Sequence, residues 1–125
     1  MTDTTTVTST IDTYLAAYNE TDAGVRQTLL EAAFAPDGRL VDPPLMGVGR
    51  DGISEMMGIV HQQFPGHVFR RSSGIDEHHD HVRYGWELLD GDGNVALAGM
   101  DVGLLDDGGR LVHVAGFFGP LPELG

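Results

Sequence analysis

The pattern of hydrophobic positions changes along the chain, from a helical period in the first half to strand-like runs in the second. Apolar residues recur every three or four positions over residues 7–20, 22–33 and 51–63, which predicts three amphipathic helices. Thr8-Ser9-Thr10 and Asp22 offer capping side chains for the first two helices. The expected apolar faces are Val25, Leu29, Ala32 and Ala33 in the second helix, and Ile53, Met56, Met57, Val60 and Phe64 in the third.

A short strand over residues 39–42 is predicted between the second and third helices, and Pro43-Pro44 ends it. Four longer runs follow the third helix, over residues 67–77, 82–89, 95–105 and 111–118, and short turns join them. Successive strands joined in this way favour an antiparallel meander. Helices first and long antiparallel strands afterwards predict an α+β domain with the helices packed on one face of the sheet.

The strand over residues 95–105 is almost wholly apolar, but it contains one carboxylate, Asp101. Strand alternation places Asp101 on one face between Gly99 and Gly103, which leave room for something to approach. A buried carboxylate must be paired, hydrogen-bonded or kept neutral by a raised pKa. From this strand alone, a structural Asp bonded to a nearby hydroxyl or backbone group is the simpler interpretation.

Composition and charge narrow the classes of function. The 125 residues suffice for one domain with its own core, and 19 acidic against 7 basic residues give a net charge of −12. Such a surface repels nucleic acid and anionic membranes, so neither is an expected partner. The chain has no cysteine, and no apolar run is long enough to span a bilayer. The first residues lack the features of a signal peptide, so we expect a cytoplasmic protein, with residues 1–7 disordered.

The turn His78-His79-Asp80-His81 combines histidines with a carboxylate, a composition that can bind zinc or nickel. Adjacent side chains on a tight turn diverge, whereas a metal site needs side chains that converge. We therefore expect a solvated turn here and no metal site.

The order of helix, helix, strand, helix and then long antiparallel strands resembles the SnoaL-like and nuclear-transport-factor-like α+β cone. The resemblance extends from about Ile11 to Phe118 and is strongest over residues 14–19, 34–43 and 100–111. In that family a curved sheet surrounds a deep pocket, and three helices pack on its concave face. The resemblance therefore implies a cone of this kind (cystatin-like or SnoaL-like) over residues 1–125.

Within the family, these segments are most similar to the ketosteroid isomerase branch, which implies roles for three residues. Tyr14 would donate to the developing enolate oxygen, Asp42 would shuttle the proton, and Asp101 would stay protonated and share the oxyanion. Met57 lies where the isomerases usually offer a supporting Tyr. The candidate residues for binding the substrate are Met57, Val60, Phe64, Trp86, Leu97, Leu105, Phe117 and Phe118.

These roles predict a cofactor-independent isomerase that acts on an enolisable hydrophobic ketone without a metal. A homodimer is also expected, because the face opposite Asp101 is too apolar for an open sheet; it comprises Ala96, Ala98, Met100, Val102 and Leu104.

Two further classes stay open. One is another enzyme on the same scaffold, either a polyketide-cyclase-like catalyst or an epoxide hydrolase with Arg83 or Arg71 between carboxylates around a water. The other is a non-catalytic binding or dimerisation domain, in which Tyr14 and Asp101 form a satisfied buried pair.

Overall fold

The computed structural model describes residues 4–125. Its elements are α1 (Thr4–Asn19), α2 (Ala23–Ala33), β1 (Phe34–Val41), β2 (Met46–Val48), α3 (Gly49–Gln63), β3 (Val68–Arg71), β4 (Asp76–His78), β5 (His81–Leu89), β6 (Val95–Leu105) and β7 (Leu111–Phe118). This order confirms the α+β class and the expected sequence of helices and strands.

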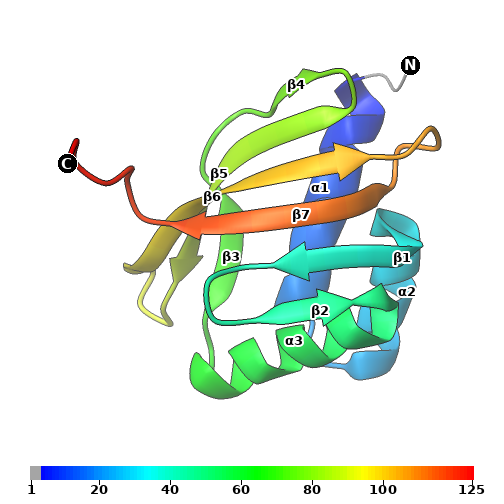
Figure 1. Ribbon diagram of the computed structural model, residues 1–125. Helices are drawn as coiled ribbons and strands as arrows, with labels where there is room; N and C mark the ends of the chain where they lie inside the picture. The colour runs from blue at the N-terminus through cyan, green and yellow to red at the C-terminus, as the bar shows by residue number, and fades with distance from the viewer. Residues whose placement is uncertain (1–3) are drawn as a thin grey trace.

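The strands form one mixed sheet in the order β2-β1-β7-β6-β5-β3, and β4 pairs with β5 (Figure 1). The predicted antiparallel meander is present in β5, β6 and β7. The strands β1 and β7 pair in parallel. The chain enters β1 from α2, and it returns to the side of β1 only with β7, the last strand of the meander. This parallel pair brings the end of β1 beside the last strand and next to the centre of the sheet.

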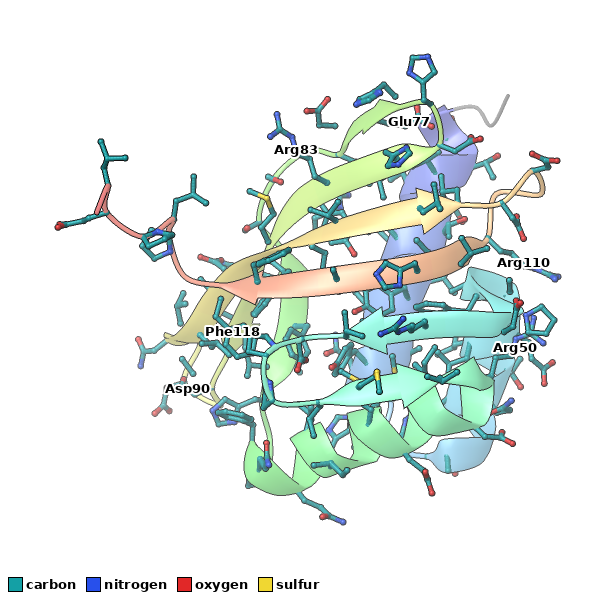
Figure 2. All side chains as sticks on the ribbon, in the orientation of Figure 1. Arg50, Glu77, Arg83, Asp90, Arg110 and Phe118 are labelled. Carbon is teal, nitrogen blue, oxygen red and sulfur yellow. The ribbon has the colours of Figure 1, made fainter. Side chains whose placement is uncertain are left out.

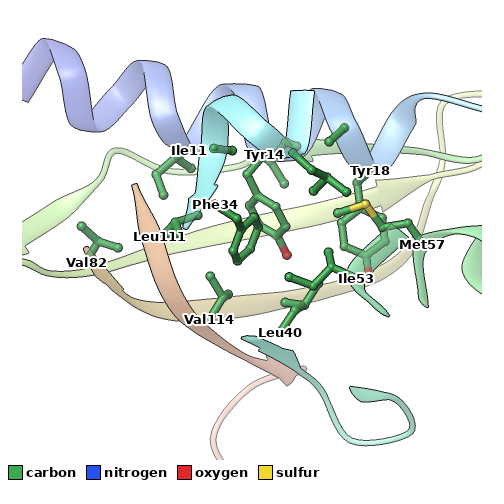
Figure 3. Close-up of a cluster of buried hydrophobic side chains, with 14 of the residues drawn as sticks. Ile11, Tyr14, Tyr18, Phe34, Leu40, Ile53, Met57, Val82, Leu111 and Val114 are labelled. Carbon is green, nitrogen blue, oxygen red and sulfur yellow. The ribbon is translucent and has the colours of Figure 1, made fainter. Parts of the chain in front are cut away.

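The helices cover the concave face of this open sheet. Behind the strands in Figure 1 lies α1, while α3 packs along β1 and β2. The core between them includes Phe34, Leu40, Leu111 and Val114, whose side chains are fully buried (Figure 3). A cavity remains between α1, α3 and the central strands, and it holds the candidate site.

The N-terminal helix begins earlier than the sequence predicted. Residues 4–7, for which disorder was expected, form the first turn of α1, and Val7 is buried. Residues 1–3 of that prediction lie outside the described residues. Thr8-Ser9-Thr10 lies inside the helix and does not cap it. The hydroxyl of Thr10 instead donates to the carbonyl oxygen of Gly109 at 2.8 Å, which ties α1 to the turn between β6 and β7.

The second helix has the predicted cap but a different buried face. The side chain of Asp22 accepts a hydrogen bond from the backbone N–H of Val25, as expected for an N-cap. The buried residues are Arg26, Leu30 and Ala33, whereas Val25 is half exposed. Ala33 belongs to both faces, but the apolar period did not include Arg26, because this buried residue is charged.

Arg26 is buried because its guanidinium group satisfies backbone carbonyl groups between the helices. It donates to the carbonyl oxygen of Glu20 at 3.0 Å and to that of Ser54 on α3 at 2.9 Å. These bonds join the loop between α1 and α2 to α3. A buried arginine of this kind holds the helical layer together.

Two strands also differ from the prediction. The segment Pro36-Asp37-Gly38, which lies between the predicted second helix and the strand predicted over residues 39–42, is part of β1, where the pairing with β7 shifts between Phe34 and Arg39. The shift accommodates Pro36, which has no backbone N–H group to donate to the hydrogen bonds between the two strands. The run over residues 67–77 is divided into β3 and β4, which pair with different parts of β5.

The strand β2 lies so close to the first turns of α3 that position 47 must be a glycine. A Cβ on Gly47 would lie 2.7 Å from the carbonyl oxygen of Gly52 and 2.8 Å from the Cα of Ile53, both backbone atoms of α3. We expect Gly47→Ala to lower the free energy of unfolding by about 1–3 kcal/mol, because the helix must move away from β2.

Urea denaturation checks this prediction, with Gly74→Ala as the matched control. A Cβ on Gly74 would meet no heavy atom within 4 Å. The control is therefore expected to change stability by less than about 0.5 kcal/mol. Equal effects of the two substitutions would show that the contact between β2 and α3 is not the cause.

The outer face of β6 has the predicted alternation. Asp101 points inward, while Met100 and Val102 remain partly exposed on the other side. Pairing of two copies through this face stays a prediction. Within the described residues, no helix is long and apolar enough to cross a membrane.

Candidate active site

Three polar residues and one glycine lie side by side across the concave face of the sheet. Asp101 on β6 pairs with Gly116 on β7 and, on its other side, with Tyr84 on β5. Val41 pairs with Ala115, so the next residue along β1, Asp42, lies beside Gly116. The order across the strands is therefore Asp42, Gly116, Asp101 and Tyr84. Neighbouring strands are about 4.8 Å apart, so the two carboxyl groups arise from backbone segments about 10 Å apart.

Asp101 is buried and accepts a hydrogen bond on each carboxyl oxygen. The hydroxyl of Tyr84 donates to Oδ2 at 2.8 Å, and the indole Nε1 of Trp86 donates to Oδ1 at 2.9 Å. Burial raises the pKa of Asp101 from 3.8 to about 7, and the two hydrogen bonds limit the rise because they favour the ionised form. Near neutral pH, Asp101 therefore exists in both protonation states.

The space beside Asp101 on its own strand is filled by the protein. A Cβ on Gly99 would overlap the ring of Trp86, and a Cβ on Gly103 would lie 3.1 Å from a methyl group of Val82. These glycines therefore admit neighbouring side chains and not a ligand, which corrects the expectation from the sequence. The opening lies across the strands, at Gly116. A Cβ there would be 3.0 Å from Oδ1 of Asp101 and 3.5 Å from the Cβ of Asp42.

Asp42 follows the last residue of β1, as the Pro43-Pro44 signal predicted. Its Oδ1 accepts a hydrogen bond from the backbone N–H of Leu45 at 3.0 Å, which fixes the side chain in the turn. Burial raises its pKa above 3.8, and the bond from Leu45 opposes that rise. Asp42 is only half buried, so it can meet a ligand that enters the cavity.

Tyr14 points from α1 into the interior (Figure 3) and lines the same cavity as Asp101. Its ring packs edge-on against Phe34, with a distance of 5.4 Å between the ring centroids. Burial raises the pKa of Tyr14 well above 10, and the negative charge of Asp101 adds to the rise. Tyr14 is thus a neutral donor, and no described residue accepts a hydrogen bond from its hydroxyl.

The cavity has a volume of about 190 Å³ and an open mouth, with Pro44 and Gln63 among its lining residues. A dry cavity of about 150 Å³ can hold benzene, so this one accommodates a small ring system. The full lining is Tyr14, Leu15, Tyr18, Leu40, Asp42, Pro44, Leu45, Val60, Gln63, Phe64, Phe69, Trp86, Leu88, Leu97, Asp101, Gly116 and Phe118.

Most but not all of the predicted lining residues face this cavity. Val60, Phe64, Trp86, Leu97 and Phe118 line it. The other three predicted positions are corrections: Met57, Leu105 and Phe117. Met57 and Leu105 are buried in the hydrophobic core. Phe117 pairs with Met100 and is more than half exposed, because strand alternation turns it outward when Gly116 faces inward.

Among residues 4–125, no arginine lines the cavity. Arg71 forms an ion pair with Asp12 at 3.0 Å, and Arg83 forms one with Asp76 at 2.8 Å. Figure 2 places Arg83 beside β4 at the edge of the sheet. The epoxide-hydrolase alternative therefore lacks the arginine that its chemistry needs between the carboxylates.

The histidine turn lies away from this cavity. His79 and Asp80 have positive φ angles of 50° and 65°, which close the tight turn between β4 and β5. Across residues 4–125, no group of three or more His, Asp or Glu side chains gathers in a way that could hold a metal ion.

The sequence did not identify three residues of the site: Tyr18, Tyr84 and Gly116. Tyr84 and Trp86 alternate with polar residues on β5, which is a signal for an inward face. That signal does not show which strand lies opposite, so the contacts with Asp101 required the register of β5 and β6. Gly116 carries no side-chain signal at all.

Comparison with solved structures defines the class of fold. The chain is similar to a nuclear-transport-factor-2-like protein of unknown function from Exiguobacterium sp. 255-15, with 20% identity, a TM-score of 0.70, and coverage of 90% of this chain and 99% of that one. It is also similar in fold to a proposed SnoaL-like polyketide cyclase from Jannaschia sp. CCS1, with 14% identity, a TM-score of 0.67, and coverage of 89% and 85%.

A further relative defines the family. A proposed isomerase of the SnoaL-like family from Agrobacterium tumefaciens str. C58 is 37% identical, with a TM-score of 0.86, and the match covers 93% of this chain and 99% of that one. This chain therefore belongs to the SnoaL-like family. No family model matches the sequence, and no curated protein matches it.

Proposed function

We propose that the protein is a cofactor-independent isomerase that moves a proton between two carbons of an enolisable hydrophobic ketone. The observation that carries the proposal is the arrangement of Asp42 and Asp101 on either side of Gly116 in one mostly apolar cavity. The SnoaL-like relative described as a proposed isomerase agrees with this class of reaction.

In the proposed mechanism, Asp42 is the base. It removes a proton from the carbon next to the carbonyl group and returns it to the γ-carbon, so that no proton is gained or lost overall. The half-buried position of Asp42 lets its carboxylate reach the substrate, and its bond with Leu45 holds it in place. A raised pKa also brings the base closer to neutral pH, where proton transfer is most efficient.

The dienolate formed in between carries its negative charge on oxygen. The hydroxyl of Tyr14 has no hydrogen-bond partner among residues 4–125, and Tyr14 lines the same cavity as Asp101, whose protonated form supplies a second donor. Donors fixed where charge develops stabilise the transition state most strongly when water is excluded. Tyr84 and Trp86 hold the carboxyl group of Asp101 in position for this role.

The direct test is isomerisation of a cyclic β,γ-unsaturated ketone by the purified protein, followed by the absorbance of the conjugated product. We expect conversion without added metal or cofactor, and inhibition by phenol, which mimics the enolate. A wild-type protein that converts none of a panel of such ketones would contradict the isomerase proposal.

The second candidate is a cyclase that forms a carbon–carbon bond by an aldol step, with Asp101 itself as acid and base. The observation that favours it is the orientation of the buried Asp101 carboxyl group by two donors, in a setting where burial raises its pKa to about 7. In that reaction Asp101 would accept the proton from the nucleophilic carbon and give one to the new alkoxide. The two candidates differ in the residue that cannot be replaced, which is Asp42 for the isomerase and Asp101 for the cyclase.

A further inference from the structure

Tyr18 places a second phenol in the cavity, one helical turn beyond Tyr14 (Figure 3). Its ring packs against Tyr14 and Phe69, with distances of 5.8 Å and 4.5 Å between ring centroids. The side chain is only 5% exposed, so these contacts fix its direction. The proposed proton shift makes no use of it.

The hydroxyl of Tyr18 has no hydrogen-bond partner among residues 4–125. Burial, followed by the negative charges of Asp42 and Asp101, raises the pKa of Tyr18, so the group remains a neutral donor. This hydroxyl lines the cavity and is therefore available to an acceptor that enters it.

The two phenols differ in the carboxyl group that affects them most. Among the carboxyl groups, Asp101 contributes most to the raised pKa of Tyr14, whereas Asp42 contributes most to the raised pKa of Tyr18. Asp42 and Asp101 lie on opposite sides of Gly116, so the two donors serve two separate points of the cavity. The ring centroids of Tyr14 and Tyr18 are 5.8 Å apart, so the two rings enter the cavity at separate points.

Resting on the proposed function, we propose that Tyr18 is a substrate-binding residue that donates to a second oxygen of the substrate on the Asp42 side of the cavity. The protein would then select ketones that carry a further hydroxyl or carbonyl oxygen over simple monoketones. Among the described residues that line the cavity, none is a Lys, Arg or His. The second oxygen therefore belongs to a neutral group and not to a carboxylate.

Binding of two phenols tests this inference. Phenol offers one oxygen, whereas 1,3-dihydroxybenzene offers a second oxygen on the same ring. We expect the wild type to bind 1,3-dihydroxybenzene about five- to tenfold more tightly than phenol, the effect of one additional hydrogen bond. In Tyr18→Phe, the affinity for 1,3-dihydroxybenzene should fall to about that for phenol, and the affinity for phenol should not decrease.

Tyr14→Phe is the matched variant, since it removes a hydroxyl from the same helix face. It should weaken both ligands by a similar factor and keep the preference for the dihydroxy compound. Thermal melting separates binding from a structural role: Tyr18→Phe is expected to melt no lower than the wild type, because the hydroxyl it removes bonds no residue among 4–125. A preference that survives in Tyr18→Phe, or an equal loss for both ligands, would overturn the inference.

The outcome is independent of the isomerase assay. If the wild type shows the preference and Tyr18→Phe loses it, Tyr18 binds a second oxygen even when no ketone is isomerised, and only the proposed reaction fails. If ketones are isomerised but the preference is absent, the inference about Tyr18 fails and the proposed reaction stands.

Discussion

Asp42→Asn is expected to lower the rate of ketone isomerisation by about two to four orders of magnitude, the usual contribution of a general base. Asparagine has nearly the same size but does not accept the substrate proton. Its side-chain oxygen can still accept the bond from the N–H of Leu45, so the turn should persist. The donors at Tyr14 and Asp101 are untouched, and binding of phenol should stay within about twofold of the wild type.

The control is Asp37→Asn, which removes an exposed carboxylate from β1, the strand that ends just before Asp42. It should leave both the rate and phenol binding unchanged. Stopped-flow or steady-state kinetics measure the rate, and calorimetry measures phenol binding. If Asp42→Asn isomerises ketones at the wild-type rate and only melts lower, Asp42 has a structural role in the Asp-Pro turn. The cyclase candidate, in which Asp101 carries the chemistry, would then be favoured.

Asp101→Asn is expected to make the protein more stable than the wild type above neutral pH. The folded-state pKa of about 7 lies above the ordinary value of 3.8, so between these values the folded protein holds a proton that the unfolded chain has released. The wild type therefore loses stability as the pH rises from about 4 to about 7. The rise of the pKa corresponds to about 4 kcal/mol at the high end of this range.

Asparagine imitates the neutral form of Asp101. Its oxygen can accept from Trp86, while its amide donates to the hydroxyl of Tyr84, which turns to accept. Urea denaturation of both proteins at a series of pH values gives the difference in stability. We expect that difference to favour Asp101→Asn increasingly between pH 4 and 7 and to level off above. Asp92→Asn, at an exposed turn position, should run parallel to the wild type. Parallel curves for Asp101→Asn would show that the carboxyl group has an ordinary pKa.

Local signals in the sequence determined much of the fold. Aspartate- and glycine-rich turns bound β6 and β7 at the predicted residues, since the side chain of Asp106 accepts the N–H groups of Gly108 and Arg110 within its own turn. The alternation of side chains along β6, which is also a local property of the sequence, predicted the face on which Asp101 lies. The resemblance to the isomerases supplied Tyr14 and Asp42, and the structure brings both into one cavity with Asp101.

The tertiary structure decided what surrounds these residues. The contacts of Asp101 depend on the register of β5 and β6, and the approach of Asp42 depends on the parallel pairing of β1 with β7. Both are contacts between segments far apart in the chain, which a period of two or of 3.6 residues does not encode. For the same reason the gap at Gly116 and the unpaired hydroxyl of Tyr18 became visible only when the strands and α1 were brought together.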